Sequence, residues 1–237
     1  MNCDPLWETI FSTRAWGRYP SEDLIRFCAQ RFYGLQPRSD VRLLEVGFGT
    51  GANLWYFARE GFSVHGLEGS EAGAAQAAQR LDMEVPGWRD RPAALGSQRL
   101  LARDMCEPLP WADGQFDAVV DCDAATCVDH DSACRVYTEM ARVTKPGGWL
   151  YVRTPASGTW GDGSGQACGH NAWRCEEGPF AGTGCVRFAT EGDLAALFAS
   201  WEVIQLEQVS RTLEGRSKVH SEWVVIGRKP AGEGAAS

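Results

Sequence analysis

The sequence predicts a single α/β domain in which helices cover both faces of a mostly parallel sheet. Three observations lead to this fold class. Apolar segments with strand character alternate with amphipathic helical segments between residues 41 and 153, a pattern typical of parallel strands joined by crossover helices. A glycine-rich segment, GFGTG, directly follows the first of these strands. The chain has 237 residues, of which 44% are hydrophobic and 23% are charged, which suits one globular domain with a substantial core.

Residues 1–39 are expected to form a helical arm that precedes the core. Ser21 stands before two acidic residues and fits a helix N-cap, because its hydroxyl can accept from the amides of the first turn. Apolar side chains then recur at helical spacing over residues 24–35. Gly34 and Pro37 are expected to end this helix.

Residues 40–155 contain the expected alternation of strands and helices. Strands are expected at Val41–Val46, Phe62–Leu67, Arg99–Ala102, Phe116–Val120 and Trp149–Arg153, and helices at Asn53–Glu60, Glu71–Leu81 and Ser132–Val143. The strand at 116–120 is largely apolar, as parallel strands buried on both faces are. Glycine after residue 60 and a Lys-Pro-Gly-Gly run at 145–148 mark two of the helix ends.

The last third of the chain begins with a segment that has no clear period. Residues 156–188 are rich in glycine, and we expect them to form a lid over a ligand, because so long a loop in a compact domain is commonly functional. Residues 189–230 are expected to hold a helix at Glu191–Phe198, capped by Thr190, followed by strands at Trp201–Gln208 and Val219–Arg228. Residues 231–237 are small and polar, and we expect a disordered tail.

Charge and composition exclude several classes of partner. The net charge of −8 disfavours broad contact with nucleic acid or anionic lipid. No apolar run reaches the ~18 residues of a membrane span, and the N-terminus lacks the apolar stretch of a secretory signal. We therefore expect a cytoplasmic protein whose nine cysteines are mostly reduced thiols.

The glycine-rich segment at 47–51 has the character of a nucleoside site. Glycines let the backbone turn tightly and approach a ligand, and the following helix presents unpaired N–H groups. Glu68, at the end of the second strand, is placed to accept both hydroxyls of a ribose. The Gly-x-Gly-x-Gly spacing differs from that of pyrophosphate loops, and Glu45 would repel a pyrophosphate. The pattern therefore favours a nucleoside with a cationic or zwitterionic tail.

The segment EVGFGTG at 45–51 resembles motif I of the class I S-adenosylmethionine (SAM)-dependent methyltransferases. Four further segments resemble stations of that family in the same order: GLEGS at 66–70, ARDM at 102–105, FDAVVD at 116–121 and RVTKPGGWL at 142–150. The resemblance covers residues 40–155 and is to the small bacterial type 11-like group. It implies a three-layer, Rossmann-like methyltransferase fold with a seven-stranded, mostly parallel sheet whose last strand is antiparallel.

The resemblance also implies SAM as the cofactor and S-adenosylhomocysteine (SAH) as the product. Glu45 would lie near the cofactor amine, Glu68 would bind the ribose, and Asp104 with the Met105 backbone would read the adenine. Trp16 would close over the cofactor from the N-terminal arm. The residues assigned to the cofactor in this way are Trp16, Glu45, Gly47, Phe48, Gly49, Asn53, Glu68, Gly69, Ser70, Asp104, Met105, Asp121 and Cys122.

The expected reaction is methyl transfer to an oxygen, or less favourably a nitrogen, of a small-molecule acceptor. His130 follows the fourth strand and is the most attractive general base, because a neutral imidazole can take a hydroxyl proton. His170 and His220 are alternatives, although His220 is expected to be structural. In the lid, Trp160, His170, Trp173 and Phe180 are expected to contact the acceptor.

No metal is expected. Cys168, His170, Cys175 and Cys185 come closest to a metal pattern, but they lack the paired spacing of zinc ligands. The expected partner is a small-molecule acceptor, with no nucleic acid and no membrane, and the protein is expected to be a monomer or homodimer.

Three alternative functions remain open at this point. A methyltransferase acting on protein side chains would need an exposed groove. A non-catalytic SAM-binding subunit would show no turnover. A nicotinamide oxidoreductase is disfavoured by the glycine spacing and by Glu45.

Overall fold

The computed structural model describes residues 5–14, 16–94 and 98–231. The strands of the main sheet are β1 (Arg42–Val46), β2 (Ser63–Glu68), β3 (Leu100–Ala102), β4 (Phe116–Cys122), β5 (Thr144–Pro155), β9 (Glu202–Leu213) and β10 (Lys218–Arg228). The helices are α1 (Leu6–Thr13), α2 (Glu22–Phe32), α3 (Ala52–Arg59), α4 (Glu71–Glu84), α5 (His130–Val143) and α6 (Glu191–Leu197). No helix in these ranges is long and apolar enough to cross a membrane.

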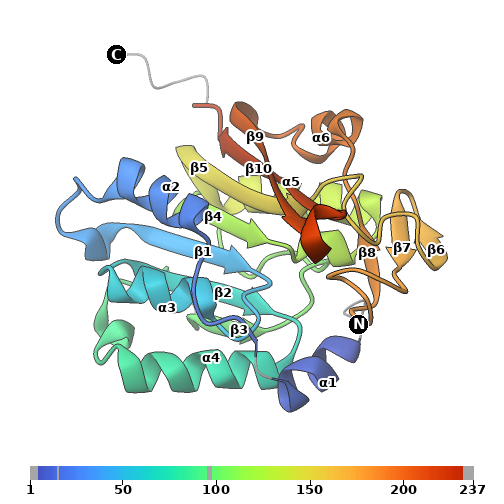
Figure 1. Ribbon diagram of the computed structural model, residues 1–237. Helices are drawn as coiled ribbons and strands as arrows, with labels where there is room; N and C mark the ends of the chain where they lie inside the picture. Colours follow the sequence, from blue (N-terminus) through green and yellow to red (C-terminus); the bar gives the residue numbers. More distant parts are fainter. Residues whose placement is uncertain (1–4, 15, 95–97, 232–237) are drawn as a thin grey trace.

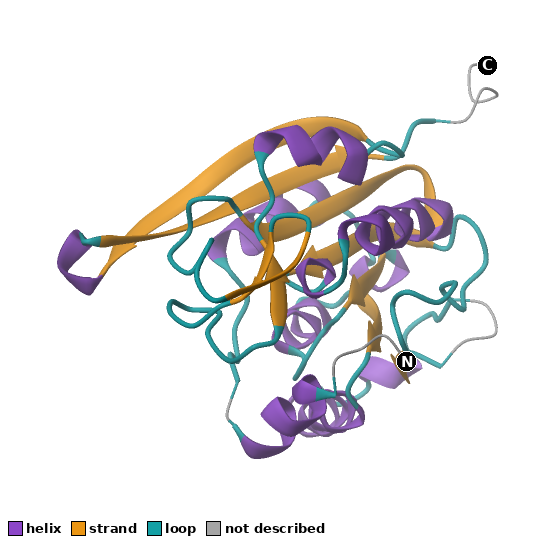
Figure 2. Ribbon diagram, turned by 90° about the vertical axis from the view of Figure 1, so that its right-hand side faces the viewer, coloured by secondary structure: helices purple, strands orange, loops and turns teal. Residues whose placement is uncertain are grey.

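The main sheet has seven strands in the order β3-β2-β1-β4-β5-β10-β9 (Figure 1). The pairs among β1 to β5 are parallel, and β10 runs antiparallel to both of its neighbours, β5 and β9. The β9–β10 hairpin extends beyond the rest of the sheet (Figure 2). The predicted fold class, a seven-stranded and mostly parallel sheet with its last strand antiparallel, is confirmed.

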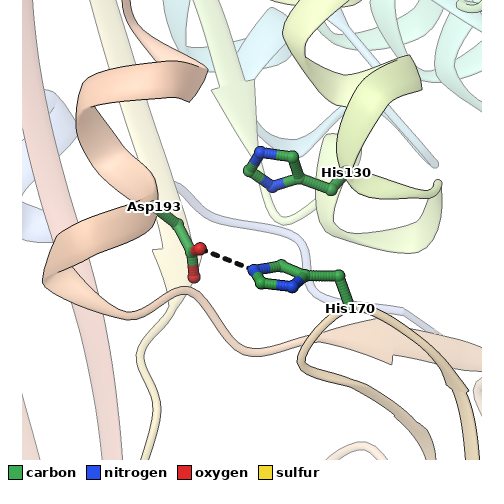
Figure 3. A group of neighbouring side chains, drawn as sticks. All are labelled: His130, His170 and Asp193. Carbon is green, nitrogen blue, oxygen red and sulfur yellow. Dashed lines mark hydrogen bonds and ion pairs between the residues drawn. The ribbon is translucent and has the colours of Figure 1, made fainter.

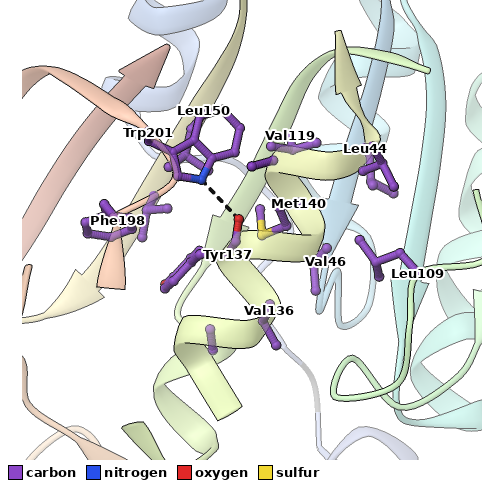
Figure 4. Packing of buried hydrophobic residues seen from close by; sticks show 14 of the residues in the cluster. Leu44, Val46, Leu109, Val119, Val136, Tyr137, Met140, Leu150, Phe198 and Trp201 are labelled. Atoms are coloured by element: carbon purple, nitrogen blue, oxygen red, sulfur yellow. Dashed lines mark hydrogen bonds between the residues drawn. The ribbon is translucent and has the colours of Figure 1, made fainter. Parts of the chain in front are cut away.

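Side chains of the central strands alternate between two hydrophobic layers, as the period of two along a strand requires. On one face Leu44, Val119 and Leu150 pack against α5 and α6 (Figure 4). Trp201 closes this layer, and its Nε1 donates a hydrogen bond to the Tyr137 carbonyl at 3.1 Å. On the other face the neighbouring residues of the same strands, among them Leu43, Val120 and Tyr151, pack against α2, α3 and α4.

Both predicted helix caps are present. Ser21 Oγ accepts from the Leu24 amide at 3.4 Å at the start of α2. Thr190 begins α6 through a reciprocal capping box with Asp193, which satisfies amides that the first turn of a helix leaves unpaired. The short helix α1 was not among the predicted elements.

The segment 156–188 is more ordered than the predicted irregular lid. Its strands β6 (Gln166–Gly169), β7 (Ala172–Arg174) and β8 (Cys185–Arg187) form an antiparallel sheet in that order. We call this sheet, together with the connection from β7 to β8, the outer sheet. In Figure 1 the outer sheet stands at the end of the main sheet toward which β1 and β4 point. Strands of three or four residues separated by glycines are too short to show a period in the sequence.

Most of the described cysteines are free, and one pair is bonded. Cys168 and Cys185 form a disulfide between β6 and β8, which the sequence analysis did not predict. The free cysteines of the described chain are Cys28, Cys106, Cys122, Cys127, Cys134 and Cys175. Of the predicted disordered tail, residues 232–237 lie outside the described ranges.

Candidate functional site

A cavity of about 430 Å³ lies at the carboxyl ends of β1, β2 and β4, where open α/β sheets bind ligands. Its volume is typical of small-molecule sites. Most of the predicted cofactor residues line it: Trp16, Glu45, Gly47, Phe48, Gly49, Asn53, Glu68, Gly69, Asp104, Met105 and Cys122. The structure therefore brings together, around one space, residues that the sequence places in five separate segments.

The glycine-rich loop requires glycine at the positions where the backbone approaches other loops. Gly47 and Gly51 have φ of +70° and +83°, a region that other residues rarely adopt. A Cβ at Gly47 would lie 2.1 Å from the Ala124 Cβ, and one at Gly51 would lie 2.6 Å from the Ala77 Cβ. The loop can therefore pass close beneath the segment after β4, and leave the cavity open, only with glycine in these places.

Glu45 carries a carboxylate oxygen without a partner at the base of the cavity. Its Oε1 accepts from Asn53 Nδ2 at 2.6 Å, whereas its Oε2 is buried and has no hydrogen-bond partner among the described residues. Burial, opposed by the Asn53 hydrogen bond and assisted by repulsion from Asp121 and Glu68, raises the pKa of Glu45 to about 8. A buried carboxylate oxygen without a hydrogen bond costs free energy. A ligand ammonium group placed beside it would offset that cost.

Glu68 ties two cavity loops together. Its Oε2 accepts from the Gly49 amide at 2.6 Å and its Oε1 from the Ser70 amide at 2.9 Å. Burial raises the pKa of this carboxyl group, and the backbone amides oppose that rise. Each carboxylate oxygen can accept more than one hydrogen bond. Glu68 therefore keeps acceptor capacity for ribose hydroxyls while it fixes the loop geometry.

Two predicted cofactor residues do not line the cavity. Ser70 caps α4 by accepting from the Gly73 amide at 3.0 Å. Asp121 is fully buried; its Oδ1 accepts from the Ala124 amide at 2.9 Å and its Oδ2 from the Tyr137 hydroxyl at 2.7 Å. Both side chains therefore hold the backbone of loops in which other residues line the cavity.

Helix α1 covers the cavity and is attached to the cofactor loops. The rings of Trp7, Phe11 and Trp16 cluster with centroids 5.3 to 5.6 Å apart, and all three line the cavity. Glu8 Oε2 accepts from the Ser70 hydroxyl at 2.6 Å and from the Ala72 amide at 3.1 Å. A carboxylate at the N-terminus of α4 is electrostatically favoured, so Glu8 holds α1 in place.

The far side of the cavity presents a polar cluster around His220, which the sequence analysis named as an alternative base without predicting its partners Arg153 and Glu222. His220 Nε2 lies 3.1 Å from Glu222 Oε2. Arg153 pairs with the same carboxylate and lies 3.3 Å from Asp23. His220 Nδ1 is buried without a hydrogen-bond partner, and the ring of Phe180 stacks on the imidazole with centroids 5.8 Å apart. The cluster therefore contains an oriented imidazole with one free nitrogen.

The pKa values of the two acidic residues Glu222 and Asp123 are shifted in opposite directions. Burial by itself would raise the pKa of Glu222, but hydrogen bonds from His220 and Arg153 outweigh it and hold the pKa well below its usual range. Burial, followed by repulsion from Glu222, raises the pKa of Asp123 well above its usual range. Asp123 also has φ of +61°, and such strained residues cluster at functional sites.

Most of the predicted base and acceptor residues lie elsewhere. His130, Trp160, His170 and Trp173 are not among the residues that line the cavity; the ring centroids of His130 and His170 are 5.0 Å apart. Phe180 is the one predicted acceptor residue of the lid that lines the cavity, and Pro179, Thr183 and Val186 line it beside Phe180. The signal for the polar cluster was present in the sequence, because two ionisable residues alternate on one face of an otherwise apolar final strand, in VHSEWVVIG.

Comparison with known proteins places these features in context. Residues 44–152 match the family model described as "Methyltransferase domain". No protein of curated function matches the sequence.

Solved structures share the fold over nearly the whole chain. A SAM-dependent methyltransferase from Methanosarcina mazei has a TM-score of 0.62 and 21% identity, covering 90% of this chain and 99% of that chain. Geranyl diphosphate C-methyltransferase from Streptomyces coelicolor, in complex with Mg²⁺, geranyl diphosphate and SAH, has a TM-score of 0.61 and 15% identity, covering 96% and 99%. The [4+2]-cyclase SpnF has a TM-score of 0.61 and 20% identity, covering 96% and 92%.

Proposed function

We propose that this chain, whose residues 44–152 match a methyltransferase domain, is a class I SAM-dependent methyltransferase that methylates an oxygen of a small hydroxylated molecule. The acceptor would lie between the cofactor loops and the outer sheet. The observation that carries the proposal is that one cavity holds both an unpaired carboxylate oxygen on Glu45 and an oriented imidazole on His220.

The chain's own residues fit the cofactor. Oε2 of Glu45 would meet the amine, Glu68 would accept from the ribose hydroxyls, and Asp104 with Met105 would contact the adenine. The Asp104 carboxylate is oriented by the Cys106 amide, which donates to its Oδ1 at 2.9 Å. Gly47 leaves the space that a side chain would otherwise fill.

Bound SAM supplies an electrophilic methyl group on a sulfonium, so the protein mainly has to align donor and acceptor. Glu222 is ionised and accepts the Nε2 hydrogen of His220, which leaves a lone pair on Nδ1. Nδ1 would take the proton of an acceptor hydroxyl, so that the hydroxyl oxygen could accept the methyl group that bound SAM would supply. A base of this kind is needed more by a hydroxyl than by a neutral amine, which favours O-methylation.

Apolar side chains around the base support an acceptor with a ring or an apolar body. Phe180, Pro179 and Val186 reach the cavity from the outer sheet, and Tyr19 reaches it from the N-terminal side. Because α1 and the outer sheet both cover the cavity, a small molecule suits it better than a protein side chain.

The proposal is tested by binding followed by turnover. We expect saturable SAM binding at micromolar concentration, and SAH formation that depends on a hydroxylated acceptor when a panel of phenols, polyols and amines is screened by mass spectrometry. SAM binding with turnover of amines or protein substrates only would refute the proposed acceptor class and leave the methyltransferase assignment intact.

A further inference from the structure

A second cluster of ionisable side chains lies outside the cavity, where the outer sheet meets the core. It consists of His130, His170 and Asp193 (Figure 3). His130 begins α5, His170 lies in the turn between β6 and β7, and Asp193 lies in the first turn of α6. One ligand atom from each of the three lies within 4.8 Å of the other two.

The contacts within this cluster leave one possible metal-ligating nitrogen, Nδ1 of His130, without a hydrogen bond among the described residues. His170 Nε2 lies 2.7 Å from Asp193 Oδ1. The ring of His130 stands edge-on to that of His170, with centroids 5.0 Å apart, and His130 Nε2 lies 3.7 Å from Cys134 Sγ. His130 Nδ1 is buried and has no hydrogen bond to any described residue. The contact between His170 and Asp193 therefore leaves one imidazole nitrogen of His130 free to bind a ligand.

The carboxylate of Asp193 is held in position from its other side. Its Oδ2 accepts from the Thr190 amide and hydroxyl, both at 2.8 Å, and from Asn171 Nδ2 at 3.0 Å. These hydrogen bonds turn Oδ1 toward the two imidazoles. Metal-ligating carboxylates in proteins are commonly oriented by hydrogen bonds of this kind.

We propose that His130, His170 and Asp193 bind one Zn²⁺ ion, with water as the fourth ligand. Two imidazole nitrogens and one carboxylate oxygen are donors that Zn²⁺ prefers, at bond lengths of about 2.0–2.2 Å. Such bonds place tetrahedral donors roughly 3.4 Å apart, and the ligand atoms of the three side chains now lie within 4.8 Å of one another.

The ion would fasten the outer sheet to α5 and α6. The connection from β7 to β8 carries Phe180, which stacks on His220 in the cavity, so a metal at the β6–β7 turn would fix the sheet that forms this wall. This inference replaces the expectation of no metal. It uses none of the cysteines of the sequence pattern considered first, two of which are joined in a disulfide.

The test is zinc binding by the full-length chain after treatment with a chelator, measured by equilibrium dialysis against ZnCl₂ with elemental analysis. We expect one equivalent in the wild type at micromolar free Zn²⁺ and none in His170→Asn. The side chain of His170 is 56% exposed, so this substitution should not disturb folding, and His130→Asn provides a second variant. The control variant Glu191→Gln removes an exposed acid from α6, the helix that contains Asp193. This variant should still bind one equivalent of Zn²⁺.

Thermal melting gives an independent measure. Zn²⁺ should raise the melting temperature of the wild type and of Glu191→Gln, and leave that of His170→Asn unchanged. Equal zinc content in the wild type and in both histidine variants would mean that free thiols bind the metal, and the proposal would be wrong. Absence of binding to the wild type would overturn it as well.

Discussion

At the scale of single residues, Glu45 is expected to lower the stability of the unliganded protein and to favour binding of the ligand. Its pKa is raised to about 8 by burial, whereas an unfolded glutamate titrates near 4.3. The native state therefore holds a proton that the unfolded state has released. Since stability falls with pH wherever the native state binds more protons, Glu45 should make the unliganded protein less stable as the pH rises from about 4.5 to about 8.

Glu45→Gln should remove this penalty and weaken cofactor binding. We expect the unliganded variant to be more stable than the wild type at pH 8 by about 1–3 kcal/mol, with the difference shrinking toward pH 5. We expect SAM affinity to fall by about tenfold or more, since a hydrogen bond to a charged group contributes about 1.5–3 kcal/mol. Melting at several pH values and calorimetric titration would measure both effects.

The matched control for this variant is Glu207→Gln, which neutralises an exposed glutamate on β9. It should change neither the pH dependence nor the affinity for SAM. Wild-type SAM affinity in Glu45→Gln would show that Glu45 does not contact the amine.

His220 and His130 make opposing predictions about the general base. His220→Asn should lower kcat by about 10²–10⁴-fold with little change in the Kd of SAM, because His220 lies at the acceptor end of the cavity. Glu222→Gln should move the pH profile of kcat, because it removes the charge that orients the imidazole. If His130→Asn abolishes turnover and His220→Asn does not, the base suggested by the sequence is the correct one.

At the scale of elements, α1 is a cover whose packing depends on glycine. A Cβ at Gly49 would lie 3.2 Å from Phe11 Cζ, and one at Gly73 would lie 2.9 Å from Phe11 Cδ2. The ring of Phe11 therefore rests directly on the cofactor loop and on α4.

Phe11→Ala should loosen this cover and weaken SAM binding by about tenfold, since one cavity wall is lost. It should also destabilise the fold by about 3 kcal/mol, as expected for a buried phenylalanine. Ile10→Ala is the control, because Ile10 is equally buried on the same helix and does not line the cavity. Affinity should be measured well below both melting temperatures. Equal loss of affinity in the two variants would show that α1 acts only through overall stability.

The disulfide between Cys168 and Cys185 is expected to hold the outer sheet together, because it joins β6 to β8 across 17 residues. Closing a loop of this length stabilises a fold by about 3 kcal/mol in the chain-entropy description. Replacing both cysteines by serine should increase hydrogen exchange in β6 to β8 and leave β1 and β4 protected. Peptide mapping without reductant should recover the linked pair. Complete alkylation of both thiols in the native protein would contradict the pairing.

How far the elements could be predicted depends on whether their signal is local. The strands and helices of 40–155 were predicted to within a few residues in most cases, because each has its own apolar period and glycine or proline boundaries. Helix α1 has only eight residues, and a helix this short depends on tertiary packing. The outer sheet was missed because its strands have three or four residues.

The same distinction between local and non-local signals explains which parts of the site could be predicted from the sequence. The cofactor end consists of loops that each follow one strand, so a short motif reports each of them. The acceptor end forms where β10 pairs with β5 and brings Glu222 opposite Pro155. The alternation of His220 and Glu222 is a local signal, but no local pattern connects Arg153 with Glu222, so the pairing that orients this cluster could not be predicted.

At the scale of the whole molecule, the cavity is a property of the complete chain. The central strands supply its floor, α1 covers it from the N-terminal side, and the outer sheet and β10 close it from the other. The family match spans residues 44–152 and contains the loops after β1, β2 and β4. Phe180 and His220, which are proposed to contact the acceptor, lie outside it.

The most direct test of the central claim is thermal melting with SAM, SAH and NADH in parallel. A ligand at 100 times its Kd adds about 2.7 kcal/mol to stability, which corresponds to roughly 5–10 °C for a domain of this size. We predict a shift of this order with SAM and SAH, none with NADH, and a reduced shift in Glu45→Gln. A shift with NADH alone, or none with SAM and SAH at millimolar concentration, would contradict the assignment of the cavity to SAM.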